Sequence, residues 1–422
     1  MSILRDLYLT GLSSVLQYII PTVVLVTTQK RSIFRYLTIP LMIWILSCNV
    51  RPMDPYCQLF VFITGQLFMS IPQATTNLLI NPLDADDLIR EAPDQTKTFA
   101  GLLYYACRQQ CQPRAIGTPR QVKGIKPHPA YYRDTKTGTM IVSRGSFILR
   151  QSVILIWQYA VLDMVEFAAH AQPMKPTPHQ TFSDLEWNVS FEVWIERAIS
   201  NLVSWFLIAR ILIDHRYRLA SIISIGLGLG TPEDWPPLFT RMSDAYTLRR
   251  FWGTFWHQFL RQPLTAFSNL IARDILHLPR PSVLERYTNI FLVFLGSAIL
   301  HRTIDIVLGI PTQYSGAMPF FTTFALAYMI EDGVQALYKC IKGFEEKDNT
   351  GLNWKHIVGY LWVATWLGVS STWYMYPASQ RTPPHALKMV PFAVSERIGI
   401  APVAGFAVIG GLGLLFGFKI EL

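Results

Sequence analysis

Long apolar stretches recur along the chain and are separated by segments rich in Lys, Arg and Pro. A bilayer core about 30 Å thick requires about 20 mostly apolar residues in a helix that crosses it. This criterion predicts nine spans, over residues 8–27, 32–50, 58–80, 146–169, 191–213, 288–309, 319–339, 356–376 and 401–418. The pattern therefore predicts an all-α fold, a polytopic transmembrane helical bundle that forms a single integral membrane domain over residues 1–422.

A tenth apolar stretch, residues 219–230, is shorter than the others and contains three glycines. A stretch of this length favours a re-entrant or interfacial segment over a span. Whether it crosses the membrane stays open at this stage.

Two long segments lie between the predicted spans. Residues 81–145 are rich in charge and proline and are expected to form a cytosolic loop. Residues 231–287 form a second cytosolic or interfacial loop, in which aromatic residues recur at helical spacing. Such spacing predicts an amphipathic helix at the cytosolic membrane interface. The aromatic residues of this helix are Tyr246, Phe251, Trp252, Phe255, Trp256 and Phe259.

Composition and charge agree with a membrane protein. Hydrophobic residues make up 51% of the 422 residues and charged residues only 15%. The net charge of +9 does not indicate a nucleic-acid partner, because the basic residues flank apolar runs as the positive-inside rule predicts. The loops after the first, third, fifth and seventh spans should then face the cytosol. We expect a multi-pass protein of the endoplasmic reticulum, with a lumenal loop that ends in the sequon Asn188-Val189-Ser190.

Neither a disulfide framework nor a metal site is expected from the five cysteines. Cys107 and Cys111 are spaced as CxxxC in a loop placed in the reducing cytosol, without a nearby histidine pair to complete a metal site. The N-terminus runs into a full-length span without a small-residue cleavage site, so the first span is expected to be retained.

His301 lies near the middle of the predicted span 288–309. An ionisable residue inside the membrane is a functional-site hypothesis by default, and an imidazole that is costly to charge is suited to act as a general base. Asp305 follows one helical turn later and could hold this imidazole in one tautomer. It could equally pair with Arg302 or Arg286, or be an ordinary charge at a helix end.

His257 is the second candidate. Anchoring at the membrane interface explains the aromatic residues around it and most of the arginines, but not a histidine beside Trp256. A buried base next to a basic, aromatic cytosolic surface suits acyl transfer from acyl-CoA to a hydrophobic alcohol, without a covalent enzyme intermediate. A polytopic protein that binds or transports a lipophilic metabolite without chemistry is the alternative from a different class.

Three segments carry a resemblance to a known family. They are Trp235-Pro236-Pro237-Leu238-Phe239, the run TLRRFWGTFWHQ at 247–258, and Leu300-His301. Over residues 226–309 the chain resembles the wax synthase-like branch of the membrane-bound O-acyltransferases. The resemblance implies that His301 is catalytic and that residues 251–258 form the second signature. Many members of the wider superfamily carry Asn or Asp in this second motif, where this chain has His257.

The branch also implies a reaction. Fungal proteins of this branch and size are similar to acetyltransferases of terpenoid and meroterpenoid pathways, which transfer acetyl from acetyl-CoA to a hydroxyl in secondary metabolism. Acetyl-CoA would be a co-substrate, and no permanently bound cofactor is expected. Long-chain wax ester synthesis is the nearest alternative, and the acyl length, the acceptor and the oligomeric state stay open.

Further residues complete the candidate site. Trp256 and Gln258 flank His257 and are expected to orient the reacting groups. Arg249, Arg250 and Arg261 are candidates for binding the phosphates of CoA, by charge alone.

Overall fold

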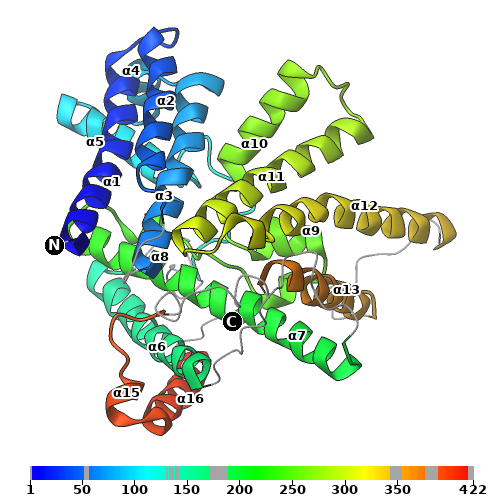
Figure 1. Ribbon diagram of the computed structural model, residues 1–422. Coiled ribbons are helices and arrows are strands. Elements are labelled where there is room, and N and C mark those ends of the chain that lie inside the picture. Colours follow the sequence, from blue (N-terminus) through cyan, green and yellow to red (C-terminus); the bar gives the residue numbers. More distant parts are fainter. Residues whose placement is uncertain are drawn as a thin grey trace. The chain divides into compact units, whose positions relative to one another are not determined.

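The computed structural model describes residues 2–51, 57–129, 132, 137, 142–171, 189–342, 354–375 and 388–416 (Figure 1). Every regular element in this part of the chain is a helix, which confirms the predicted all-α fold. Asn188 of the predicted sequon lies outside the described residues. The chain divides into two compact units, each described separately below.

Unit 1 is built from residues 1–122 and 259–326. Its helix α1 packs against α2, α3 and α5, and α11 packs against α3 and α10. The elements are α1 (Ser2–Thr27), α2 (Ile33–Ser47), α3 (Cys57–Thr75), η1 (Thr76–Ile80), α4 (Ala85–Glu91), α5 (Phe99–Cys111), α10 (Arg261–Asn269), η8 (Leu270–Ile275), α11 (Val283–Val307), η9 (Thr312–Tyr314) and the start of α12 (Ala317–Lys342).

A buried arginine joins three parts of unit 1. Arg35 of α2 is fully buried, and its guanidinium donates to the main-chain oxygens of Thr28 and Leu83, both at 2.7 Å, and of Leu25 at 3.2 Å. A buried cation is tolerated when its donors are satisfied, and here the acceptors are two carbonyl groups at the end of α1 and one in the turn after η1. Arg35 therefore fastens the end of α1 and the turn after η1 to α2.

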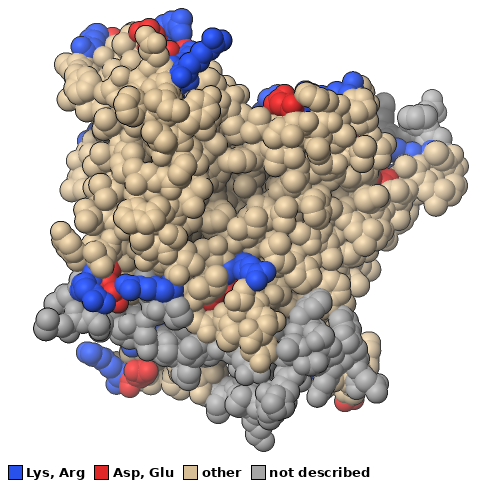
Figure 2. Space-filling view, turned by 45° about the horizontal axis from the view of Figure 1, so that its top comes forward, with Lys and Arg blue, Asp and Glu red and all other residues tan. Residues whose placement is uncertain are grey.

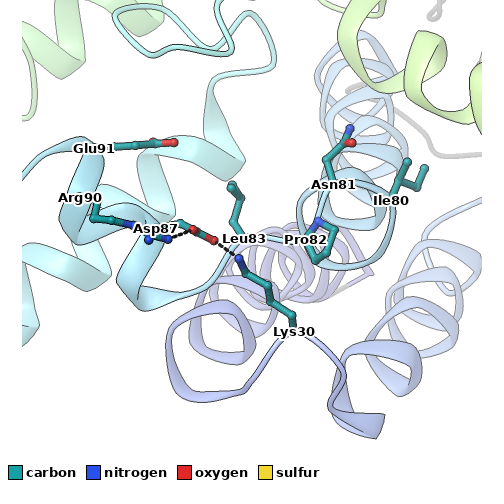
Figure 3. Close-up of a pocket in the computed structure, with 8 residues that line it drawn as sticks. All are labelled: Lys30, Ile80, Asn81, Pro82, Leu83, Asp87, Arg90 and Glu91. Atoms are coloured by element: carbon teal, nitrogen blue, oxygen red, sulfur yellow. Dashed lines mark hydrogen bonds and ion pairs between the residues drawn. The ribbon is translucent and has the colours of Figure 1, made fainter.

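An open pocket of about 510 Å³ lies beside this turn in unit 1 (Figure 3). Lys30 points to Asp87 of α4 across 2.6 Å, and Arg90 contacts the same carboxylate from the next turn of that helix. Asn81 and Glu91 complete the polar side of the pocket. Lys30 and Arg90 both pair with Asp87, so this pocket joins the α1–α2 turn to α4.

Unit 2 is built from residues 123–258, 327–376 and 387–422. Helix α6 packs against α8 and α16, which lie beside it in Figure 1, and α7 packs against α13. The elements are α6 (Arg144–Ala171), α7 (Phe191–Val203), η4 (Ser204–Ala209), α8 (Arg210–Gly226), η5 (Pro232–Asp234), η6 (Met242–Asp244), α9 (Leu248–Arg250), η7 (Phe251–Phe255), the rest of α12, α13 (Trp354–Ser370), α15 (Ser395–Ile398) and α16 (Ile400–Phe416).

Helices cover most of every predicted span. Four of them in the described part are long and apolar enough to cross a membrane, namely Tyr8–Thr27, Arg144–His170, Phe191–Gly226 and Val283–Val307. Charged atoms gather at the end of unit 1 that carries α4, and a broad surface without charge lies below them (Figure 2). The short apolar stretch 219–230 is not separate from the fifth span, because α8 continues the helix to Gly226.

Candidate active site

His301 lies on α11 of unit 1, and its ring is held from two directions. Nδ1 is 2.8 Å from the carbonyl oxygen of Ser297, one helical turn earlier. The ring lies against Phe321 of α12, with centroids 4.2 Å apart and planes 31° apart. A carbonyl can only accept, so Nδ1 carries the proton and Nε2 of the neutral imidazole is the basic nitrogen.

Phenylalanine rings form the wall behind His301. Phe320, Phe321 and Phe324 of α12 are each at most 2% exposed. Phe324 stacks on Phe294 of α11 with centroids 5.1 Å apart, so the two helices are packed ring against ring. Of these rings Phe321 covers one face of the imidazole, and Phe320 packs edge-on against Phe321 with centroids 4.8 Å apart.

Asp305 is almost fully buried on α11, one turn beyond His301. The hydroxyl of Ser315 donates to its carboxylate at 2.6 Å, which joins the end of α11 to the loop before α12. The orienting role predicted for Asp305 stays a prediction, and the Nδ1 proton of His301 is directed by Ser297.

The second signature, residues 247–258, lies in unit 2 and begins with a capped turn. The hydroxyl of Thr247 accepts a hydrogen bond from the Arg250 amide at 3.1 Å and so caps α9. The chain then forms the π-helical turn η7, closed by a 2.7 Å bond from the Trp256 amide to the Phe251 carbonyl. Trp256 itself is extended, so the helix ends at Phe255, two residues before His257.

The segment is helical as predicted, but the prediction that its aromatic rings lie at the membrane interface is wrong. Phe251 and Phe255 are fully buried and Trp256 is 6% exposed, so these rings face protein rather than lipid. Trp256 packs edge-on against Trp205 and Phe239, both with centroids 5.3 Å away. Aromatic residues have the same helical spacing whether their rings face lipid or a protein core. Here the rings pack in the core of unit 2.

His257 and Gln258 lie directly after this aromatic cluster. The His257 ring stands perpendicular to Phe239 with centroids 6.0 Å apart and also packs on Trp256. The Gln258 side chain donates to the main-chain oxygens of Trp252 and Trp256. Gln258 therefore closes the turn that presents His257, and the orienting role predicted for it stays a prediction.

The three arginines differ in their surroundings. Arg249 forms an ion pair with Asp332 at 2.7 Å. The guanidinium of Arg250 donates to the Asp244 carbonyl at 3.0 Å and lies near the carboxylate of the same residue. Arg261 is exposed at the first position of α10. The charges of Arg249 and Arg250 are therefore partly balanced by carboxylates.

The structure groups the predicted residues by unit. Unit 1 contains Arg261, His301 and Asp305, and unit 2 contains Arg249, Arg250, Trp256, His257 and Gln258. Among the described residues, no cluster of three or more His, Cys, Asp and Glu side chains could hold a metal ion.

Comparisons with known proteins identify the family. The model of the membrane bound O-acyl transferase family matches residues 235–323. The acetyltransferase atnC of Arthrinium sp is 36% identical, over 94% of this chain and 93% of the relative. The acetyltransferases pyr8 of Aspergillus fumigatus and TRI7 of Fusarium sporotrichioides are each 37% identical, over 91% and 83% of this chain and 90% and 81% of their own lengths.

The chain belongs to the membrane bound O-acyl transferase family. No solved structure matches it. Membership confirms the predicted resemblance, and it makes this protein a membrane protein and an O-acyltransferase that uses an acyl-CoA co-substrate.

The match to the membrane bound O-acyl transferase family ends at residue 323, shortly before a pair of acids that sequence reasoning missed. Glu331 and Asp332 lie in unit 2 on α12, where both contact the start of the second signature. A signal existed, because two adjacent carboxylates interrupt a predicted span, and such residues are a functional hypothesis by default. Phe321 gave no comparable signal, since a phenylalanine in a span is ordinary.

Proposed function

We propose that the protein is an O-acetyltransferase of secondary metabolism, which transfers acetyl from acetyl-CoA to a hydroxyl of a hydrophobic terpenoid or meroterpenoid intermediate. The observation that carries this proposal is the near full-length similarity to several proteins named acetyltransferases. The tautomer of His301 supports this proposal, because it leaves on Nε2 the lone pair that a general base requires.

His301 is the proposed general base. Nε2 takes the proton of the acceptor hydroxyl while the hydroxyl oxygen attacks the thioester carbonyl of acetyl-CoA. The tetrahedral intermediate then collapses, the carbon–sulfur bond breaks, and the CoA thiolate receives the proton back from Nε2. The products are the acetate ester and CoA, and no covalent enzyme intermediate forms.

The remaining candidate residues have proposed supporting roles. His257 donates a hydrogen bond to the thioester oxygen, where negative charge develops. Trp256 and Gln258 hold that ring in place, and Asp305 supports the end of the helix that carries His301. Of the arginines, Arg261 is the most exposed candidate for a CoA phosphate, with Arg249 and Arg250 as further candidates.

The proposed topology is a single integral domain with nine spans in the endoplasmic reticulum membrane. In it, residues 81–145 and 231–287 face the cytosol, where acetyl-CoA is available. The continuous helix Phe191–Gly226 has 36 residues, whereas a span needs only about 20. Residues 219–230 are therefore proposed to lie at the membrane interface rather than to cross the membrane.

Acyl transfer in microsomes tests the proposal. Labelled acetyl-CoA and palmitoyl-CoA are each supplied with a panel of terpenoid and long-chain alcohols. We expect acetyl esters of a terpenoid alcohol, formed only in membranes that contain the protein. Long-chain esters in their place would favour wax ester synthesis. Accumulation of an unchanged alcohol together with its movement across the membrane would favour a binder or transporter.

A further inference from the structure

Helix α12 holds the start of the second signature with a buried carboxylate. Glu331 is 6% exposed, and both of its oxygens are used. Oε2 accepts from the Leu248 amide at 2.6 Å, and Oε1 accepts from the Arg249 amide at 3.3 Å. The indole N–H of Trp362, on α13, donates to Oε2 at 3.2 Å. Three donors therefore converge on one carboxylate.

The neighbours of Glu331 on α12 contact the same short helix. Asp332 forms the ion pair with Arg249, and the Arg249 guanidinium lies 4.8 Å from the ring centroid of Tyr328. The Tyr328 hydroxyl donates to the Leu248 carbonyl at 3.3 Å. Leu248 is thus held by its amide and by its carbonyl, from two side chains one turn apart on α12.

Helix α13 fixes the residues just before this point. The Tyr360 hydroxyl donates to the Ser243 carbonyl at 2.6 Å. Gly359 lies so close to Tyr246 that a Cβ placed there would be 2.0 Å from the Tyr246 carbonyl oxygen. The main chain at the start of the signature is therefore contacted by α12, and the main chain just before it by α13.

Burying a carboxylate costs free energy unless hydrogen-bond donors satisfy its oxygens. A neutral side chain could pack α12 against α9 without this cost. Glu331 instead satisfies amides in the first turn of α9, which the chain leaves without helical partners. From there α9 and η7 continue without interruption to Phe255, so the position of this turn determines where the helix ends.

We propose that Glu331 is a positioning residue for acyl transfer, whose carboxylate anchors the second signature and thereby places His257 against the acyl donor. This inference rests on the proposed acetyltransferase function. Glu331 acts through the segment it holds and does not touch the substrate.

Kinetics of Glu331→Gln test the inference, with Glu192→Gln as the matched control. Glutamine keeps the size of the side chain but offers one acceptor oxygen instead of two. We expect kcat for acetyl transfer to fall roughly 10- to 100-fold, the equivalent of losing hydrogen bonds to a charged group, while the KM for acetyl-CoA changes by less than about twofold. Glu192 is an exposed carboxylate at the start of α7, and its variant should match wild type.

A double-mutant cycle distinguishes positioning from a general structural role. If Glu331 acts by placing His257, Glu331→Gln should cost far less activity in a His257→Ala background than in wild type. Glu331→Asp, which keeps both oxygens, should recover part of the lost kcat. All rates are normalised to folded protein, measured as the monodisperse fraction after detergent extraction.

Two outcomes would overturn the inference: full activity of Glu331→Gln, or losses that simply multiply in the double variant. Wild-type membranes without any acetyl transfer would instead contradict the proposed function, so the two failures are distinguishable.

Discussion

His301 and the second signature are held in place by different means. His301 is oriented by a main-chain carbonyl of its own helix and by the face of Phe321. The signature is held by side chains of other helices, above all by the carboxylate of Glu331. The contact between His301 and Ser297 follows from the helix itself, whereas the position of the signature depends on individual residues more than seventy positions away along the chain.

The two arrangements differ in which contacts an amino-acid substitution can remove. The Ser297 carbonyl belongs to the main chain, so no side-chain substitution at that position deletes it. Single substitutions can remove the side chain of Glu331, Tyr328 or Tyr360. Each would remove a hydrogen bond that holds the main chain at or just before the signature. We therefore expect the geometry of the base to be robust and the geometry around His257 to be fragile.

The largest effect is expected from removing the base. His301→Ala should reduce acetyl transfer by roughly 10²- to 10⁴-fold, the usual contribution of a general base. The measurement is initial rate in microsomes at matched protein levels. His170→Ala is the control, because His170 makes the same contact, 2.8 Å from Nδ1 to the carbonyl one turn earlier, at the end of α6. Equal rates for His301→Ala and wild type would remove His301 as the base.

His257 tests the other side of the comparison. His257→Ala should lower kcat by roughly 10²-fold, as expected for the loss of one donor to a developing oxyanion. His257→Asn should retain more activity than alanine, because its amide can still donate. The two variants are compared by kcat and by the KM for acetyl-CoA. A rise in KM alone would show that His257 binds CoA rather than stabilising the reaction.

A change in the packing around the signature is expected to have a smaller effect, which acts through the stability of the fold. Gly359→Ala would place a Cβ against the Tyr246 carbonyl and should destabilise the protein by about 1–3 kcal/mol. The Tm in detergent should fall, and kcat should fall with it. Gly333→Ala on α12 is the control, because nothing lies within 4 Å of its new Cβ and alanine favours helix. An unchanged Tm for Gly359→Ala would contradict this close contact.

The smallest effect is expected at the charged pocket of unit 1, far along the chain from both His301 and the second signature. Burial opposes ionisation of Asp87, but hydrogen bonds from Lys30 and neighbouring groups outweigh it and lower the pKa of this carboxyl to about 2. A folded pKa below the unfolded value of about 3.9 contributes stability above about pH 4, which is lost as the pH falls towards 2.

Asp87→Asn should therefore reduce stability at neutral pH by less than about 1 kcal/mol, the range of solvent-exposed ion pairs. It should also flatten the dependence of Tm on pH below about pH 4. Asp94→Asn serves as the control, because the side chain of Asp94 is 88% exposed. A drop in acetyl transfer as large as that of His257→Ala would show that this pocket has a role beyond fastening.

The sequence predicted the helices well and singled out His301 as a candidate base, whose role stays a prediction; both follow from one rule. Apolar length identifies a helix that can enter a membrane, and the same rule makes an ionisable residue such as His301 conspicuous. It could not show that Phe251 and Trp256 are buried, because helical periodicity does not distinguish lipid from protein as the apolar environment. Glu331 was conspicuous by the same rule as His301, but its partner depends on packing between segments distant in sequence.

The π-helical turn η7 constrains the length of the second signature. Its 2.7 Å hydrogen bond joins the Phe251 carbonyl to the amide five residues later, one residue more than an α-helical turn contains. Deleting one residue here would restore the ordinary turn and rotate the following side chains by about 100° around the helix axis. His257 would then leave its place beside Phe239 with its chemical identity unchanged. Insertions and deletions are therefore expected to be excluded between Thr247 and His257, even where individual side chains vary.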